Sequence, residues 1–358
     1  MDENRPAAAQ PDLTLNGTPG RSGVAQAVTL LLPFVGLTLV IVPFSVYAEN
    51  FLTLSNFKTV AIQTVVVAIA GMGMTYVIIS GGIDLSVGSV IALSMVATAL
   101  ALKYHFPPAT AILCGLAAGG LCGFLNGAMI TVLRIVPFIA TLGMLGMARG
   151  VAKLLAREQT VFVEQETWVN DIMLKVPREE WLAAEPQWFE NLPDRIRVPI
   201  EEIVFSPGLW ILRATVVVMW LVLRYTTFGR YTIAIGSNEP TARLCGVRVH
   251  TYKIWIYLLM GVMAGLAGVL TFSRQTIGNP TEGVGLELDV IAAVVIGGGS
   301  LSGGEGSVVG TLVGALAMSF LRAGCTLLGW PNPIQEVFIG IFIVMFVAID
   351  QLRRARTA

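Results

Sequence analysis

Charged residues are scarce in this sequence, because Asp, Glu, Lys and Arg together make up only 13% of its 358 residues. The 23 basic residues balance the 23 acidic ones, so the chain has no net positive field that would attract nucleic acid. Only two histidines occur, His105 and His250, and they lie far apart in the sequence. This composition argues against nucleic-acid binding and offers no histidine cluster for a metal site.

Motifs of nucleotide-binding and metal-binding proteins are also missing. The four cysteines, Cys114, Cys122, Cys245 and Cys325, show no CxxC spacing, so we expect free thiols and neither a disulfide nor a metal site. The chain lacks a GxxxxGK[ST] phosphate-binding loop, and no lysine follows Lys253. We therefore expect no cofactor and no catalytic residue in this chain.

Apolar residues are abundant: 55% of the chain is hydrophobic, and its mean hydropathy is +0.74. Apolar runs recur near the length of about 17 to 25 residues that a helix needs to cross a bilayer. The eighth run is too short to cross alone and ends in glycines, which is typical of a broken helix that lines a protein cavity. We predict an all-α polytopic membrane protein with about ten transmembrane helices, in the runs 24–46, 58–79, 88–102, 109–133, 135–156, 207–223, 254–272, 286–298, 307–328 and 334–349.

The distribution of charge divides the chain into segments. Residues 157–206 carry eleven acidic and five basic residues, whereas the loop 224–253 holds five bases and the single acid Glu239. A plain count of Lys and Arg does not decide the orientation, but this clustering places the loop and both termini in the cytoplasm and the acidic insert outside. The predicted segments are a disordered cytoplasmic tail at 1–22, a first transmembrane helix set at 23–156, the extracytoplasmic insert at 157–206, a second set at 207–350 and a basic cytoplasmic tail at 351–358.

The acidic insert contains Trp168, Trp181 and Trp188 between polar residues. Aromatic residues in a polar setting are typical of a small folded segment or of one that lies at the membrane interface. The insert is therefore either a docking surface for an extracytoplasmic partner or an amphipathic segment that lies on the membrane surface. The sequence favours neither interpretation.

A glycine pair and a carboxylate interrupt the apolar sequence at residues 80–89, SGGIDLSVGS. Asp84 and Ser86 can cap the following helix by accepting its free amide protons, within a tight turn between helices. Alternatively, a charged group at membrane depth is costly enough to indicate a role in lining the solute path or holding a gate.

Two more carboxylates, Glu287 and Asp289, open the short eighth run. There their negative charges can interact favourably with the positive end of a helix dipole, or they can border the path of a polar solute. Asn126 is a further candidate for this path, together with the polar residues Gln63, Thr141 and Gln275.

Glycines recur at spacings of three to four residues in two apolar runs, a pattern that predicts close helix packing. They are Gly115, Gly119, Gly120, Gly123 and Gly127 in the fourth run and Gly261, Gly265 and Gly268 in the seventh.

The string FGRYTIAIGSNEPTARLCGV covers residues 228–247 of the basic loop. Asn238 can act as the N-cap of a short helix, and Pro240 suits an early helical position. Ala242, Leu244 and Val247 could present a small apolar face to a groove.

A further string, ELDVIAAVVIGGGSLSGGEGS, covers residues 287–307. Its segment LSGGE looks like the LSGGQ signature of ABC ATPases, but an ATPase also needs the phosphate-binding loop that this chain lacks. We interpret the segment as a flexible glycine turn between two membrane helices.

These three strings resemble those of permease subunits of bacterial ABC importers for monosaccharides, the ribose, galactose and xylose class. The resemblance runs from the second apolar run to the C-terminus and implies a type II ABC importer-like bundle. It also implies a cytoplasmic helix that docks into a separate ATPase subunit, where ATP and Mg would bind. The residues that match this docking loop are Gly236, Asn238, Glu239, Ala242, Arg243, Leu244 and Gly246; the family more often has small residues at Pro240 and Thr241 and Ser at Cys245, and its insert is usually shorter than 157–206.

The resemblance implies a multi-pass permease of the bacterial inner membrane that moves a monosaccharide and is not an enzyme. Its partners would be the ATPase, an extracytoplasmic sugar-binding protein, a second permease copy or paralogue, and membrane lipid. A rival hypothesis is an ion-coupled secondary transporter of a small polar solute, with Asp84, Glu287 or Asp289 as proton or sodium sites. An intramembrane protease is a weaker rival, because no histidine lies in the interior of an apolar run.

Overall fold

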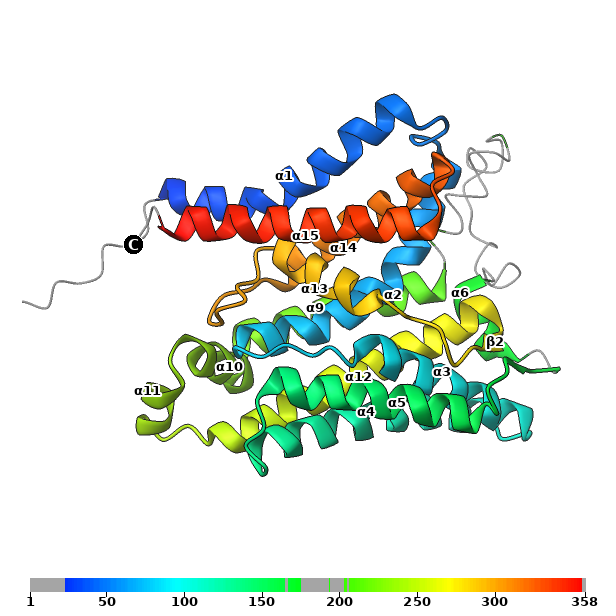
Figure 1. Cartoon of the computed structure of the whole chain (residues 1–358), viewed down its shortest axis with the longest axis horizontal. Coiled ribbons are helices and arrows are strands. Elements are labelled where there is room, and N and C mark those ends of the chain that lie inside the picture. Colours follow the sequence, from blue (N-terminus) through cyan, green and yellow to red (C-terminus); the bar gives the residue numbers. More distant parts are fainter. Residues whose placement is uncertain (1–22, 165–166, 175–192, 194–202, 205, 356–358) are drawn as a thin grey trace, which may run out of the picture.

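The computed structural model describes residues 23–164, 167–174, 193, 203–204 and 206–355, which form an elongated bundle of helices (Figure 1). Each of the ten predicted apolar runs coincides with a helix. The helices are α1 (Gly23–Tyr47), α2 (Leu54–Ile79), α3 (Val87–Lys103), α4 (Pro108–Thr131), α5 (Pro137–Leu155), α9 (Pro207–Tyr225), α12 (Val249–Gln275), α13 (Leu286–Ile296), α14 (Val308–Leu327) and α15 (Asn332–Ala355).

Six helices of the described residues are long and apolar enough to cross a membrane, namely α2, α4, α5, α9, α12 and α14. Helix α3 and the apolar parts of α1 and α15 are shorter. With 11 residues, α13 rises only about 16 Å, as expected of a helix that cannot cross alone. The predicted number of about ten crossings stays a prediction.

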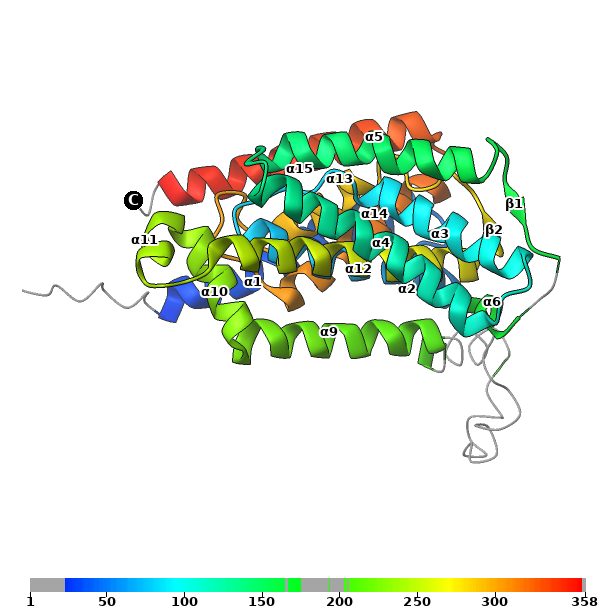
Figure 2. The same ribbon diagram turned by 90° about the horizontal axis from the view of Figure 1, so that it is seen from below.

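Short elements mark the two ends of the bundle. Helices α10 (Thr227–Ser237) and α11 (Glu239–Leu244) lie at one end, where α1 begins and α15 ends (Figure 1). Helix α6 (Trp168–Leu174) and the strands β1 (Val161–Phe162) and β2 (Ile277–Gly278) lie at the opposite end (Figures 1 and 2).

Local sequence signals explain where several helices begin. Helices α4, α5 and α9 each have a proline in their first turn, where the missing amide proton costs nothing. Thr53 and Ser307 are the N-caps of α2 and α14, and their hydroxyl groups accept hydrogen bonds from the amides of Asn56 and Gly310.

Helix α2 forms the centre of the bundle, since 89% of its most apolar stretch is buried, whereas the value for α9 is 22%. Figure 2 shows α9 along one flank. Helix α12 packs against α2, α3 and α4, so the two halves of the sequence form one interlocked bundle.

Glycines allow α4 and α12 to approach closely, which confirms the predicted packing. A Cβ atom on Gly123 would lie 2.8 Å from the Cα of Gly261, and Gly119 contacts Gly261 and Gly265 in the same way. At this separation a side chain larger than hydrogen would push the helices apart.

The described parts of the acidic insert pack on the second half of the chain. Strand β1 pairs antiparallel with β2. The amide of Met173 in α6 donates a hydrogen bond of 2.9 Å to the hydroxyl of Ser273 in α12, which itself donates to the carbonyl of Asn170. Trp181 and Trp188, the tail 1–22 and residues 356–358 lie outside the described residues. Helix α15 continues five residues past the expected boundary at 350.

Candidate functional site

The turn between α2 and α3 holds a buried carboxylate. The chain leaves α2 through Gly81, whose φ of 81° favours glycine. One oxygen of Asp84 then accepts hydrogen bonds from the amide of Ser86 at 2.8 Å and from the Ser86 hydroxyl at 2.6 Å. The predicted capping of α3 is wrong for Ser86, which occupies the N-cap position but makes no capping hydrogen bond and instead binds Asp84. Asp84 does accept a free amide proton at the helix start, that of Ser86.

Asn126 brings α4 to the same place. Its amide nitrogen donates to the Ser86 hydroxyl at 3.1 Å and to the second oxygen of Asp84 at 3.4 Å. Asp84, Ser86 and Asn126 are all buried, and we call them the Asp84 cluster. These donors offset the cost of burying the carboxylate, so the cluster ties the turn after α2 to α4.

The predicted path residues Glu287 and Asp289 lie in the first turn of α13. The Asp289 carboxylate is fully buried in α13 and accepts a hydrogen bond of 2.6 Å from the Nε of Arg322 in α14. The Glu287 carboxylate lies against Gly88 at the start of α3, where a Cβ atom would be 2.6 Å away. Both carboxylates lie in the first turn of α13, as expected of an interaction with the helix dipole, and Asp289 in addition pairs with a side chain of another helix.

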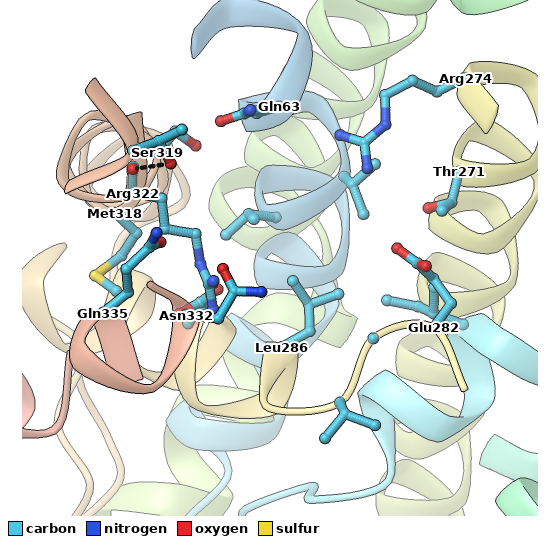
Figure 3. A pocket seen from close by; sticks show the side chains of 17 residues that line it. Gln63, Thr271, Arg274, Glu282, Leu286, Met318, Ser319, Arg322, Asn332 and Gln335 are labelled. Atoms are coloured by element: carbon cyan, nitrogen blue, oxygen red, sulfur yellow. Dashed lines mark hydrogen bonds and ion pairs between the residues drawn. The ribbon is translucent and has the colours of Figure 1, made fainter. Parts of the chain in front are cut away.

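Asp289 and Arg322 lie beside a polar cavity of about 320 Å³ between α2, α12, α13, α14 and α15 (Figure 3). Arg274 of α12 lies across the cavity from Arg322, and Gln63 of α2 appears between them in this view. Glu282, in the loop before α13, accepts a hydrogen bond of 2.8 Å from Gln275. The cavity therefore combines fixed donors and acceptors, as binding sites for polar small molecules do.

Helix α11 forms the predicted short helix of the basic loop. Asn238 is its N-cap and accepts a hydrogen bond of 3.0 Å from the amide of Thr241, which confirms the expected cap, and Pro240 lies in the first turn. Gly246 follows the helix with a φ of 84°. The expected apolar face is wrong in part: Ala242 and Val247 are buried against Ile235 and Val249, and only Leu244 is exposed.

Glu239 anchors α11 electrostatically. Its two carboxylate oxygens bind Arg243 at 3.1 Å and Lys253 at 2.6 Å. Partial burial acts to raise the pKa of Glu239, but the hydrogen bonds and charges of Lys253 and Arg243 outweigh it and hold the pKa below its ordinary value. The pair with Lys253 fixes the short helix to the start of α12.

The three strings singled out in the sequence meet at the inner side of α10. Gly236 of α10 packs against the carbonyl oxygen of Ile79, and a Cβ atom on it would also lie 2.7 Å from the amide of Gly304. Gly303 in turn contacts the backbone of Gly236 and Gly81. The LSGGE segment is thus a turn between α13 and α14, as expected, with a φ of 85° at Gly303 and 80° at Gly304.

Most residues of the cavity were not predicted as site residues, among them Arg274, Glu282, Ser319 and Arg322. Arg322 carried a usable signal, since a charge in an apolar run indicates a buried partner or a polar cavity. Ser319 carried none, because a single hydroxyl is common in membrane helices. All four cysteines are free thiols, as expected.

Comparison with known proteins shows which family this chain belongs to. Residues 56–347 match the family described as "Branched-chain amino acid transport system / permease component". The match covers most of the chain and includes the Asp84 cluster, the cavity and α11. The chain belongs to this permease family.

The permease is similar to several sugar transport proteins along most of its length. It is 35% identical to the Ribose import permease protein RbsC of Escherichia coli K12, covering 89% of this chain and 93% of that protein. It is 34% identical to the Fructose import permease protein FrcC of Rhizobium meliloti, covering 89% and 84%. It is 30% identical to the L-arabinose ABC transporter permease protein AraH of Azospirillum brasilense, covering 96% and 94%.

No solved structure matches the permease. Its family and its apolar helices make it a multi-pass inner-membrane transport subunit. The match also agrees with the expected extent of the resemblance, from the second apolar run onward.

Proposed function

We propose that the permease is the membrane-spanning subunit of an ATP-driven ABC importer and carries a monosaccharide delivered by a soluble binding protein. The observation that carries this proposal is its similarity to import permeases for ribose, fructose and L-arabinose over most of the chain. The same similarity favours this function over an ion-coupled secondary transporter.

A separate ATPase subunit would bind ATP and Mg and dock on α11, through Gly236, Asn238, Glu239, Ala242, Arg243, Leu244 and Gly246. Support comes from the exposed Leu244, which is 89% accessible at the tip of a helix braced by the Glu239–Lys253 pair. An exposed apolar residue on a rigid helix is a suitable anchor for a groove on a partner.

The end of the bundle with α10 and α11 would face the cytoplasm. Arg224, Arg230, Arg243 and Arg248 concentrate there, and α1 begins and α15 ends at the same end (Figure 1). The opposite end, with β1, β2 and α6, would then receive the sugar-binding protein. A second permease copy or a paralogue would complete the passage within the lipid bilayer.

Closure of the ATPase would move α10 and α11 and shift the permease between outward and inward access, a change of population between two states. Gly236 supports this role, because it contacts the backbone of α2 and of the α13–α14 turn, so a movement of α10 would reach both. The Asp84 cluster lies directly after α2 and would act as a gate in this motion.

ATP hydrolysis by the assembled complex tests this function. The permease is co-purified with its candidate ATPase in lipid nanodiscs, and hydrolysis is measured with the sugar-binding protein in empty and loaded form. The proposal predicts stable co-purification and faster hydrolysis with the loaded protein. The proposal is contradicted if the ATPase does not associate with the permease, or if its hydrolysis rate is the same with the empty and the loaded binding protein.

A further inference from the structure

The cavity beside Asp289 has the size of a site for a single small molecule. Its volume of about 320 Å³ lies at the lower end of ligand pockets, which span roughly 300 to 1,000 Å³. Its lining residues come from α2, α3, α12, α13, α14, α15 and the loop before α13 (Figure 3).

The charges around the cavity cancel. Arg274 and Arg322 contribute two positive charges, and Glu282 and Asp289 contribute two negative charges. An ion of either sign would face one attractive and one repulsive pair, and its own desolvation would remain uncompensated. The lining therefore favours a neutral polar molecule.

Two buried polar atoms of the lining have no hydrogen-bond partner within the described residues: the Oδ1 of Asp289 and the hydroxyl of Ser319. The Asp289 side chain is 0% exposed and Ser319 is 2% exposed. Unpaired buried groups are costly, and a ligand that donates to Asp289 and bonds with Ser319 would remove that cost. A hydroxyl group can both donate and accept, so it suits both atoms.

A second hollow adjoins this cavity. It has a volume of about 480 Å³, and it shares Gln63 and Thr326 with the cavity. The rest of its wall includes the polar residues Asn56 and Thr59 near the start of α2. This start lies at the end opposite α10 and α11, so the second hollow lies between the cavity and that end (Figure 1).

We infer that this cavity is a binding site within a single subunit for a neutral polyhydroxyl solute, one monosaccharide ring. Arg274 and Arg322 donate to ring hydroxyls, Glu282 and Asp289 accept from them, and Ser319 and Gln63 bind further hydroxyls. Leu286 and Met318 supply apolar wall for the ring carbons. The inference rests on the proposed function and adds to it a place where the solute rests in each subunit.

Equilibrium binding to the purified full chain in nanodiscs, without ATPase or binding protein, tests this site. Labelled ribose, fructose and L-arabinose serve as neutral probes, and ribonate and glucosamine as an anionic and a cationic one. The variants are Arg274→Gln and Ser319→Ala. The matched control is Ser94→Ala, which removes a buried and equally unpaired hydroxyl of α3 outside the cavity.

If the cavity is this binding site, the permease binds at least one neutral sugar and binds both charged probes more weakly. Arg274→Gln weakens sugar binding roughly tenfold or more, since a hydrogen bond from a charged group is lost. Ser319→Ala weakens it several-fold and Ser94→Ala leaves it unchanged, while the melting temperature shows that each variant folds.

Equal sugar affinity in all four proteins overturns the inference, and so does tighter binding of a charged probe. Uptake by the assembled transporter separates this result from the proposed function. Uptake of a neutral sugar by a transporter whose permease alone binds none overturns the inference and leaves the function intact. Binding that responds to the variants, without ATP-driven uptake, supports the site and contradicts the function.

Discussion

The backbone amide of Gly304, in the turn between α13 and α14, donates a hydrogen bond of 2.8 Å to the carbonyl oxygen of Ile79, the last residue of α2. Gly236 of α10 packs against the same carbonyl oxygen. Three segments far apart in the sequence thus meet at one backbone atom. Because no side chain lies between them, a displacement of α10 cannot be absorbed by a rotamer change and must move α2 or the turn.

Gly236→Ala is expected to disrupt this junction. The added Cβ atom would collide with the backbone of α2, and overpacking of this kind costs about 1 to 3 kcal/mol. We predict a lower melting temperature for the purified permease and a loss of ATP-driven uptake. The control is Gly143→Ala on α5, where a Cβ atom meets nothing within 4 Å. Equal stability and uptake for the two variants would refute the close contact.

Asn126→Ala removes the donor that ties α4 to the Asp84 cluster. The Asp84 carboxylate stays buried with one donor fewer, so the free energy of unfolding should fall by about 1 to 3 kcal/mol. Ser89→Ala is the matched control, because the buried Ser89 hydroxyl has no partner among the described residues. Thermal unfolding in detergent compares the two, and an equal shift for both would argue against the cluster.

Arg322→Met leaves the Asp289 carboxylate buried without its ion-pair partner. Breaking a buried pair in this way costs about 3 to 5 kcal/mol, and the one-third exposure of Arg322 places the expected loss near the lower value. The double variant Arg322→Met, Asp289→Asn removes the orphaned charge and should recover part of the stability. A double-mutant cycle of melting temperatures measures the coupling. Additive effects would show that the two side chains do not interact.

The Glu239 ion pairs should make the stability of α11 depend on pH. Because the folded pKa lies below the ordinary value of 4.5, the pairs stabilise the folded state above that value. Their contribution is lost as the pH falls through the lowered folded pKa. We predict that wild type melts above Glu239→Gln at neutral pH and that the difference vanishes in acid. A difference that grows as the pH falls would contradict the direction of the pKa shift.

Leu244→Asp should uncouple the permease from its ATPase without unfolding it. Leu244 is exposed, so its replacement leaves the internal packing unchanged. A central interface residue contributes about 2 kcal/mol or more, so affinity for the ATPase should fall at least 30-fold. Leu244→Ala should give a smaller loss. Thr251→Asp adds the same charge at an exposed position of α12 and should retain binding, measured by titration of the ATPase onto nanodiscs. Equal affinity of the ATPase for the Leu244 and Thr251 variants would show that the ATPase does not contact Leu244.

Features encoded by neighbouring residues were predictable from the sequence. The ten helices follow from long apolar runs. The Asn238 cap follows from a hydrogen bond between residues only three positions apart, Asn238 and Thr241. Close packing of α4 and of α12 on some neighbour was also predictable, because glycines repeat along each helix, but their pairing with each other was not. Each of these signals lies within one element.

Features that join distant elements were not predictable. Arg322 and Asp289 are 33 residues apart on different helices, and only the folded bundle turns them toward each other. The face of α11 was predicted wrongly because apolar spacing does not tell which face the bundle covers: Ala242 is buried and Leu244 is not. Capping of α3 by Ser86 was one of two predicted roles, but its hydroxyl donates to Asp84 and makes no capping hydrogen bond.

Uptake of labelled monosaccharides into proteoliposomes that hold the permease, its ATPase and the sugar-binding protein tests the central claim most directly. Uptake is measured with and without ATP at the ATPase face, while an uncoupler removes the ion gradient. An ATP-driven importer predicts uptake that requires ATP and survives the uncoupler. Uptake that ignores ATP and collapses with the gradient would contradict the account and identify an ion-coupled transporter.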